Sequence, residues 1–257
     1  MWYCSREHQT GHWKQHKKVC KATDAVSVRC REVARFLAEE PVDSWQTCTD
    51  SFIYDKSCYE GPFYESLIAL GACETLVARM SFPCESRGRV ATIQLSDFFC
   101  RLSSIDDGAR RLSVTCTYHL LAKLFSAYLM DIDAIHAFLD LVVNLLSEEE
   151  ARAKLLSSLG PVVEGVLIAM RAHTAVVEVA VAGTVAVSLL AETSRPDVLS
   201  GLLNAGAVEV LNAAMLAFPE DRECIGFRAT SALGILQRYA ASIPASVPAA
   251  VPETAHV

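Results

Sequence analysis

The chain has 257 residues and a formal net charge of −7, with 52% apolar and only 8% aromatic residues. This length allows a substantial core, and the aliphatic composition favours packed helices over a β-sandwich, which would need turns roughly every 8–12 positions. Residues 1–35 carry eight Lys or Arg and three acids, a net of +5, so the remainder carries −12. The acidic body argues against nucleic acid as a partner, and binding through the basic head is kept as an alternative.

Ten cysteines are present, and eight of them are spaced singly between positions 30 and 224. Isolated cysteines in a chain of this length are typical of reduced thiols, so we expect a cytoplasmic or nuclear protein. No leading apolar segment of the secretory type is visible. The longest uncharged apolar run, Val179–Ala191, has 13 residues. Because roughly 20 residues are needed to cross a bilayer, we expect no membrane partner.

The stretch 3–20 is rich in side chains that bind zinc. Cys4 and His8 are four residues apart, and so are His16 and Cys20. A four-residue step places both members of a pair on one helical face, within reach of one metal ion. Thiolate and imidazole are the ligands that Zn²⁺ prefers, so the stretch predicts a zinc site.

The same stretch resembles the second half of the MYND zinc finger. The positions in register with that family are Tyr3, Cys4, Ser5, Gln9, Trp13, His16, Lys17 and Cys20. The resemblance implies two pairs of Zn²⁺ ligands, Cys4 with His8 and His16 with Cys20. It also implies that Gln9 and Trp13 line a groove for a proline-containing peptide.

Two departures from the family pattern matter. The family has cysteine where this chain has His8, which is also a competent zinc ligand. The first two Cys-x₂-Cys pairs of the family are missing before Met1, so each of its two crossed zinc sites would be half built. Three interpretations stay open: the missing pairs lie upstream of the given start, the four ligands share one Cys₂His₂ zinc, or the segment is a metal-free relic.

Self-comparison of the body reveals internal repeats. Gly71–Met80 and Gly206–Met215 share six of ten residues at an offset of 135, which is three times 45. At an offset of 45, Val163–Glu178 aligns with Val208–Glu223. Gly71 and Gly206 open the two segments that are 135 residues apart, and each glycine is expected to permit a sharp turn between two helices.

These repeats resemble armadillo repeats, with Leu202–Gln237 the best copy. The resemblance implies an all-α fold, a right-handed superhelix of about four repeats with long third helices at Thr174–Glu192 and Glu220–Ala240. A generic helical bundle is the alternative. Stacked repeats would share one core and offer a curved surface to an extended partner. The asparagine ladder of armadillo grooves is not found, because Asn144, Asn204 and Asn212 are not in equivalent positions.

The sequence therefore predicts four segments: a partial MYND-type zinc finger (1–22), a helix with an irregular linker (23–64), armadillo-like repeats (65–240) and a disordered Pro/Ala-rich tail (241–257). Within the second segment, Ala25–Glu39 has a helical pattern and 41–62 is irregular. In the tail, proline recurs every four residues, which excludes a helix.

No catalytic motif is visible: there is no glycine-rich phosphate loop, no Gly-x-Ser-x-Gly and no His-Glu-x-x-His, so we do not expect an enzyme. His119, His136 and His173 stand singly, and we interpret them as surface or core residues. We interpret the chain as a scaffold whose finger takes a proline-containing peptide and whose repeats take a second protein. The alternative is a non-catalytic remnant or subunit of a MYND-containing methyltransferase-type complex.

Overall fold

The computed structural model describes residues 27–35, 38–39, 61–80, 98–114 and 117–243. All regular secondary structure in these ranges is helical, with no strand among them. The predicted all-α class is therefore confirmed for this part of the chain. The predicted zinc finger and nearly all of the predicted tail lie outside the described residues.

In chain order the helices are α3 (Gly61–Ala69), α4 (Ala72–Met80), α6 (Asp106–Val114), α7 (Thr117–Ala127), α8 (Ile132–Ser147), α9 (Glu149–Leu155), α10 (Leu159–Ala172), α11 (Val177–Glu192), α12 (Pro196–Asn204), α13 (Ala207–Ala217) and α14 (Phe227–Ser242). From α7 onward the helices follow one another through short turns. Residues 27–35 and 98–103 are also helical. A 3₁₀ turn, Leu156–Ser158, precedes α10, and a π-helical turn, Arg222–Gly226, precedes α14.

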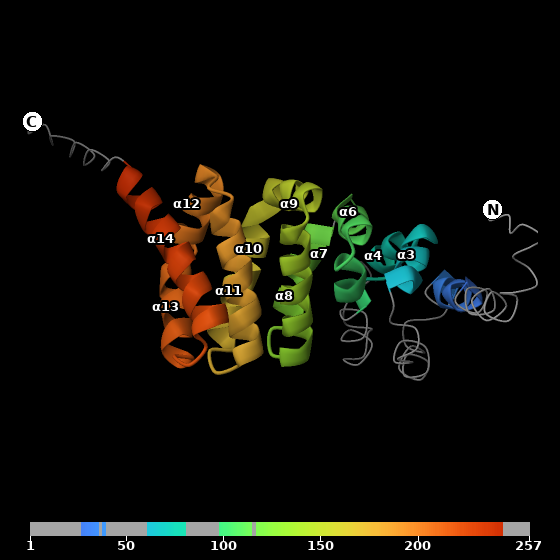
Figure 1. Cartoon of the computed structure of the whole chain (residues 1–257), viewed down its shortest axis with the longest axis horizontal. Helices are drawn as coiled ribbons and strands as arrows, with labels where there is room; N and C mark the ends of the chain where they lie inside the picture. Colours follow the sequence, from blue (N-terminus) through green and yellow to red (C-terminus); the bar gives the residue numbers. More distant parts are fainter. Residues whose placement is uncertain (1–26, 36–37, 40–60, 81–97, 115–116, 244–257) are drawn as a thin grey trace, which may run out of the picture.

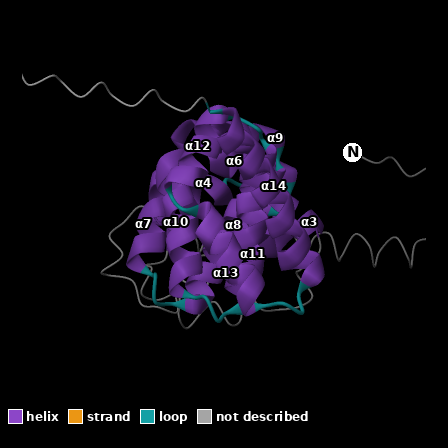
Figure 2. Cartoon of the chain, turned by 90° about the vertical axis from the view of Figure 1, so that its left-hand side faces the viewer, coloured by secondary structure: helices purple, strands orange, loops and turns teal. Residues whose placement is uncertain are grey.

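Helices α6 to α14 form three successive units of three helices each. In every unit the third helix (α8, α11 or α14) has 16 residues and is longer than the first and second. The third helices pack in the order α8, α11, α14, and the second helices in the order α7, α10, α13. Figure 1 shows the units side by side along an elongated body, and Figure 2 shows the second and third helices as separate layers.

Two glycines make the turn between a first and a second helix. Gly71 joins α3 to α4 with φ 83°, and Gly206 joins α12 to α13 with φ 76°. This left-handed region is accessible to glycine without the steric cost that a Cβ imposes. The role predicted for the two glycines is confirmed.

Small side chains let the third helices pack closely. α11 lies against both α8 and α14, and it buries residues around most of its circumference, including Ala182, Gly183 and Ala186. A Cβ on Gly183 would lie 2.5 Å from Cγ of Met170 in α10. The alanine- and valine-rich sequence of α11 is thus explained by its position in the middle of the core.

The helix at 27–35 joins the core through its buried side. Cys30 and Val33 are 1% and 2% exposed, and the Cys30 thiol lies 3.6 Å from the Phe63 carbonyl oxygen in α3. The structure confirms helix at 27–35 and 38–39 within the predicted range Ala25–Glu39.

Several predicted boundaries are corrected. α3 begins at Gly61, so the end of the predicted linker 41–62 is helical, because proline at position 62 fits the first turn of a helix. The third helix expected to start at Thr174 starts at Val177. The last one, expected over Glu220–Ala240, consists of the π turn and α14 and ends at Ser242.

No single helix of the described segments has the length and apolar composition to span a membrane. Two pairs of helices satisfy the criteria only when joined across a break, α9 with α10 at 95° and α12 with α13 at 66°.

Candidate functional site

The predicted finger residues lie outside the described part of the chain: Cys4, His8, His16, Cys20, Gln9 and Trp13. Two thiols and two imidazoles have the chemistry of one tetrahedral Cys₂His₂ zinc site. Within the described residues, no group of three or more His, Cys, Asp or Glu side chains is placed to hold a metal ion. The sequence-predicted ligands are thus the candidates for zinc, and they lie outside the described residues.

The described cysteines differ in their exposure. Cys30 and Cys73 are buried, and Cys224 is exposed. Burial, with a smaller contribution from the neighbouring Glu74 carboxylate, raises the pKa of the Cys73 thiol to about 12. Because the thiolate is the form that binds metals and attacks electrophiles, Cys73 is inert at neutral pH.

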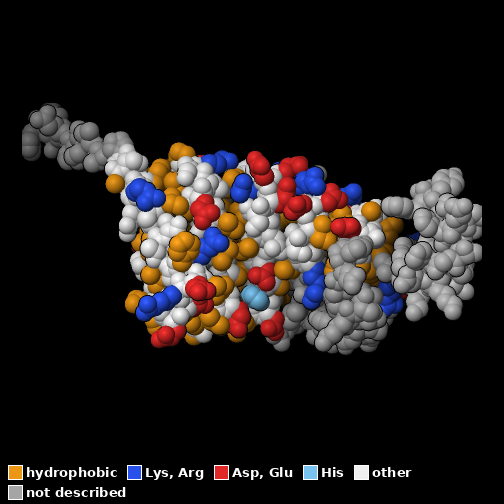
Figure 3. All heavy atoms as spheres, viewed as in Figure 1, with side chains coloured by type: hydrophobic (Ala, Val, Ile, Leu, Met, Phe, Trp, Pro, Cys, Tyr) orange, Lys and Arg blue, Asp and Glu red, His pale blue; other side chains and the backbone are white. Residues whose placement is uncertain are grey.

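The third helices present one face of the molecule, seen in Figure 3. A hollow between α8 and α11 is lined by four valines, Val143, Val177, Val181 and Val185, which we call the valine hollow. His136, Asp140 and Glu178 also line it. Imidazole Nε2 of His136 lies 3.6 Å from Oδ2 of Asp140, which is an ion pair when the imidazole is protonated. The hollow can therefore accept an apolar group beside a cationic one.

The other half of this face lies over α11 and α14. Arg228 Nη1 is 3.5 Å from Glu192 Oε1, and the Ser188 hydroxyl donates to the same carboxylate oxygen at 3.0 Å. The Phe227 side chain is 68% exposed at the start of α14. The face therefore combines apolar and charged groups from all three units.

The two histidines with described side chains have different settings. His173 is 8% exposed, and its Nε2 lies 2.6 Å from the carbonyl oxygen of Leu129. This contact joins the end of α10 to the turn after α7. His136 is half-buried and lines the valine hollow. The interpretation of His173 as a core residue with a partner is confirmed, and His136 is a surface residue.

The asparagines form no ladder. Asn144 in α8 donates to the carbonyl oxygen of Cys100 at 3.1 Å and to Ser103 Oγ at 3.0 Å. Asn144 therefore links α8 to the helical residues 98–103 by hydrogen bonds. Asn204 lies in the first helix α12 and Asn212 in the second helix α13, so neither is equivalent to Asn144.

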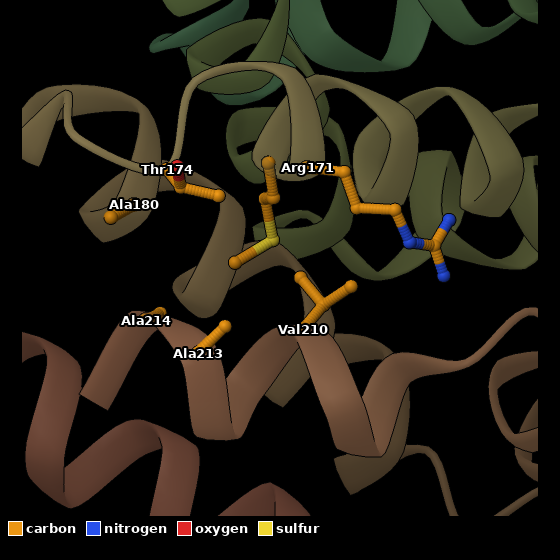
Figure 4. A pocket seen from close by; sticks show the side chains of 7 residues that line it. Arg171, Thr174, Ala180, Val210, Ala213 and Ala214 are labelled. Atoms are coloured by element: carbon orange, nitrogen blue, oxygen red, sulfur yellow. The ribbon is translucent and has the colours of Figure 1, made fainter. Parts of the chain in front are cut away.

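A small apolar pocket lies where α10, α11 and α13 meet. Figure 4 shows Val210 and Ala213 of α13 facing α10, with the Arg171 guanidinium directed away from them. The pocket holds about 30 Å³, roughly the volume of one water molecule. This space is a packing gap and is too small for an organic cofactor.

The valine hollow is not predicted by the sequence pattern. Its signal was a valine every four residues in α11, at positions 177, 181 and 185, which places the three side chains on one face of a helix. Val177 is exposed and Val181 and Val185 are half-buried, and because they stand among buried apolar residues, periodicity does not separate this row from the core.

Three comparisons with known proteins bear on the chain. Residues 1–20 match the MYND finger family, whose members are zinc-binding modules of protein interaction. No curated protein matches the chain.

Among solved structures, the chain resembles two engineered proteins from the Northeast Structural Genomics Consortium. The first has a TM-score of 0.62 at 15% identity and covers 80% of this chain and 79% of its own. The second has a TM-score of 0.58 at 17% identity and covers 84% of this chain and 97% of its own. At such low identity the likeness concerns the fold alone. The chain thus combines a MYND-like N-terminal segment with a helical body that known structures share.

Proposed function

We propose that this chain is a non-catalytic interaction scaffold of the cytoplasm or nucleus. A MYND-type finger with Cys4, His8, His16 and Cys20 as zinc ligands takes a proline-containing peptide, and an armadillo-like array takes a second protein. The observation that carries the proposal is the match of residues 1–20 to a family of zinc-binding interaction modules.

The repeated three-helix units support the second half of the proposal. Each unit has a short first helix, a second helix and a 16-residue third helix, with a left-handed glycine between the first two in α3–α4 and α12–α13. This order of helices is the one expected of armadillo repeats. Stacked third helices form an extended surface with a valine hollow, which suits a protein partner better than a small substrate.

The zinc ligands act by holding the finger segment in one fold. Bound Zn²⁺ supplies folding free energy, and the four side chains can complete one tetrahedral site. Gln9 and Trp13 are then available for the peptide, because neither is needed as a ligand. The indole of Trp13 offers a large rigid surface on which a proline ring can pack.

The test is metal analysis of the purified chain, followed by titration with a proline-containing peptide monitored by Trp fluorescence. We expect about one zinc per chain if the four ligands share one site. The variant C20S should lose the metal and the peptide response. The variant W13A should keep the metal and lose peptide affinity. Zinc-free protein that still binds the peptide would refute the finger mechanism.

A further inference from the structure

The turns between the second and third helices lie along one edge of the molecule. Figure 1 shows them at the lower side of the body, and Figure 2 shows the same loops crossing from the second-helix layer to the third-helix layer. We call this surface the turn edge and define it by residues 128–133, 174–178 and 216–227.

The turn edge is unusually apolar for a set of exposed turns. It holds five of the nine large apolar side chains that are exposed among the described residues: Met130 (84%), Ile132 (43%), Val177 (38%), Leu216 (82%) and Phe227 (68%). Every one of the three units contributes at least one of them. Such exposed side chains have few core contacts, and their gathering along one edge makes them available to a partner.

The same edge is acidic. Its three segments hold six acids and one base, Arg222, for a net charge of −5. Two of the acids are N-caps: Asp131 caps α8 and accepts from the Ala134 amide at 3.3 Å, and Asp221 caps the π turn before α14 and accepts from the Cys224 amide at 3.0 Å. Capping explains why these acids are present, but it does not explain the apolar residues beside them.

The opposite edge, where third helices lead into first helices, has another character. It comprises residues 104–107, 147–150 and 193–197, and none of the exposed large apolar side chains of the described chain lies there. Counted in the same way, it also holds six acids and one base, Arg195, so the two edges have the same net charge. Three of its acids have basic partners: Asp107 with Arg111 at 3.2 Å, Glu150 with Lys154 at 2.8 Å, and Asp197 with Arg195 at 2.6 Å. On the turn edge, Glu178, Glu220 and Glu223 have no ion pair within the described residues.

We propose that the turn edge docks a basic amphipathic segment of a partner protein. The proposal rests on the scaffold function and specifies the chemistry of its second partner. Leucine-like side chains of that partner would cover Met130, Val177 and Leu216, and its Lys or Arg residues would meet the acids between them. The long Lys side chain suits this pattern, because its stem packs on apolar surface while its ammonium group reaches a carboxylate.

The spacing of the units favours a helical partner. Packed helices lie roughly 8–10 Å apart, so successive turns should recur at about that interval. Seven residues of an α-helix advance by about 10.5 Å, so one apolar side chain per heptad would meet each turn in order. The negative charge of the edge disfavours nucleic acid and anionic membranes as occupants.

The probe is a synthetic Leu/Lys peptide of about 15 residues, long enough for partial helicity, with its leucines on one helical face. A scrambled peptide of the same composition and a Leu/Glu version serve as controls, and binding to the full chain is measured by fluorescence anisotropy at two salt concentrations. We expect the amphipathic Leu/Lys peptide to bind at least about tenfold more tightly than either control, with affinity falling as salt rises.

Two double variants test whether the Leu/Lys peptide binds at the turn edge. The double variant L216S/F227S and the double variant E178Q/E220Q should each weaken binding of the Leu/Lys peptide by about tenfold or more. Matched controls on the second helix α10, I168S and E164Q, should leave it unchanged, since both side chains are exposed but lie off the edge. Circular dichroism checks that every variant keeps its helices.

Equal binding of the scrambled peptide would reduce the interaction to net charge and overturn the proposal. Equal losses in the α10 controls, or binding of the Leu/Glu peptide, would overturn it too. So would preference for duplex DNA or anionic vesicles over the Leu/Lys peptide. Zinc content and the proline-peptide titration do not involve this edge, so they separate a failure here from a failure of the scaffold function.

Discussion

At the scale of single residues, buried polar groups show where the core departs from simple apolar packing. Thr184 in α11 is fully buried, and its hydroxyl has no hydrogen-bond partner among the described residues. Ser188, one turn further along, is equally buried, but its hydroxyl donates to Glu192. The two residues allow the cost of an unsatisfied hydroxyl to be measured within one helix.

Replacing Thr184 by valine should stabilise the protein by about 1 kcal/mol, because it removes an unpaired hydroxyl at nearly constant volume. The matched change S188A should destabilise it, since that hydroxyl has a partner. Urea denaturation of both variants measures the difference in the free energy of unfolding. A loss of stability in T184V would show that the hydroxyl is satisfied in solution.

The Cys73 thiol predicts a dependence on alkaline pH. Its pKa is raised from 9.0 to about 12 in the folded chain, so the unfolded chain loses the proton first as pH rises. The contribution of this thiol to the free energy of unfolding is therefore fully present below pH 9. It is lost between pH 9 and 12, by up to roughly 4 kcal/mol. Urea denaturation at stepped pH should show a shallower decline for C73A than for the wild-type chain. If the stability of C73A and of the wild-type chain fell equally between pH 9 and 12, the raised pKa of Cys73 would be contradicted.

At the scale of elements, glycines decide how closely helices approach and how they turn. Gly206 is the left-handed residue between α12 and α13, whereas Gly201 lies inside α12 with nothing within 4 Å of an added Cβ. Gly165 in α10 faces Phe125 of α7, whereas Gly160 in α10 also has nothing within 4 Å. Each constrained glycine thus has an unconstrained counterpart nearby.

The variant G206A should lose about 1–2 kcal/mol of stability, because alanine is strained at φ 76°. Its Cβ would also lie 2.8 Å from Nη2 of Arg171, whose guanidinium donates to the Ala205 carbonyl oxygen. The control G201A should gain about 0.5–1 kcal/mol from better helix propensity. Thermal denaturation of both variants distinguishes backbone strain from a general effect of adding a methyl group.

The variant G165A should be destabilised by about 1–3 kcal/mol, since its Cβ would lie 2.8 Å from Cδ2 of Phe125 and force α7 and α10 apart. G160A in the same helix should not lose stability. Equal stability of the two variants in urea would mean that the Phe125 ring moves aside freely.

At the scale of the whole molecule, the core runs without interruption from Cys30 to Leu236. One connected core joins all the described helices, so the array should fold as a unit that does not need the predicted zinc ligands. Stacked units of this kind derive their stability from interfaces between neighbours.

Metal removal should therefore separate the finger from the array. We expect a zinc chelator to leave the melting temperature and the far-ultraviolet circular dichroism of the array unchanged within about 2 °C, less than a ΔΔG of 1 kcal/mol would produce. The proline-peptide response should disappear in the same sample. A large drop in the melting temperature would show that the finger supports the array.

Much of the fold could be predicted because its signals are local. The Gly-Ala repeats at positions 71 and 206 revealed both the period and the left-handed turns, and the aliphatic composition indicated helices. Helix starts are less predictable: proline at position 62 is typical of a linker by sequence, but it occupies the first turn of α3. Alanine-rich runs give little indication of where a helix begins.

The zinc ligands could be predicted from the sequence, whereas the valine hollow and the turn edge could not. Cys4, His8, His16 and Cys20 were found because metal ligands follow a strict spacing, and their arrangement remains a prediction. The valine hollow and the turn edge were not found, because both consist of residues from different units that only the stacking of helices brings together. The residue type alone does not indicate whether a valine is exposed or buried.

The π turn at Arg222–Gly226 has a consequence for how this chain can change over evolutionary time. A π turn holds more residues than an α turn, so it is a place where the last long helix can gain or lose one amino acid. The Gly226 amide donates to the Asp221 carbonyl oxygen at 2.9 Å across this turn, and after the loss of one residue the same pair would have the i→i+4 spacing of an α-helix. A deletion of one residue at this point would thus leave both the loop before the turn and α14 behind it in place.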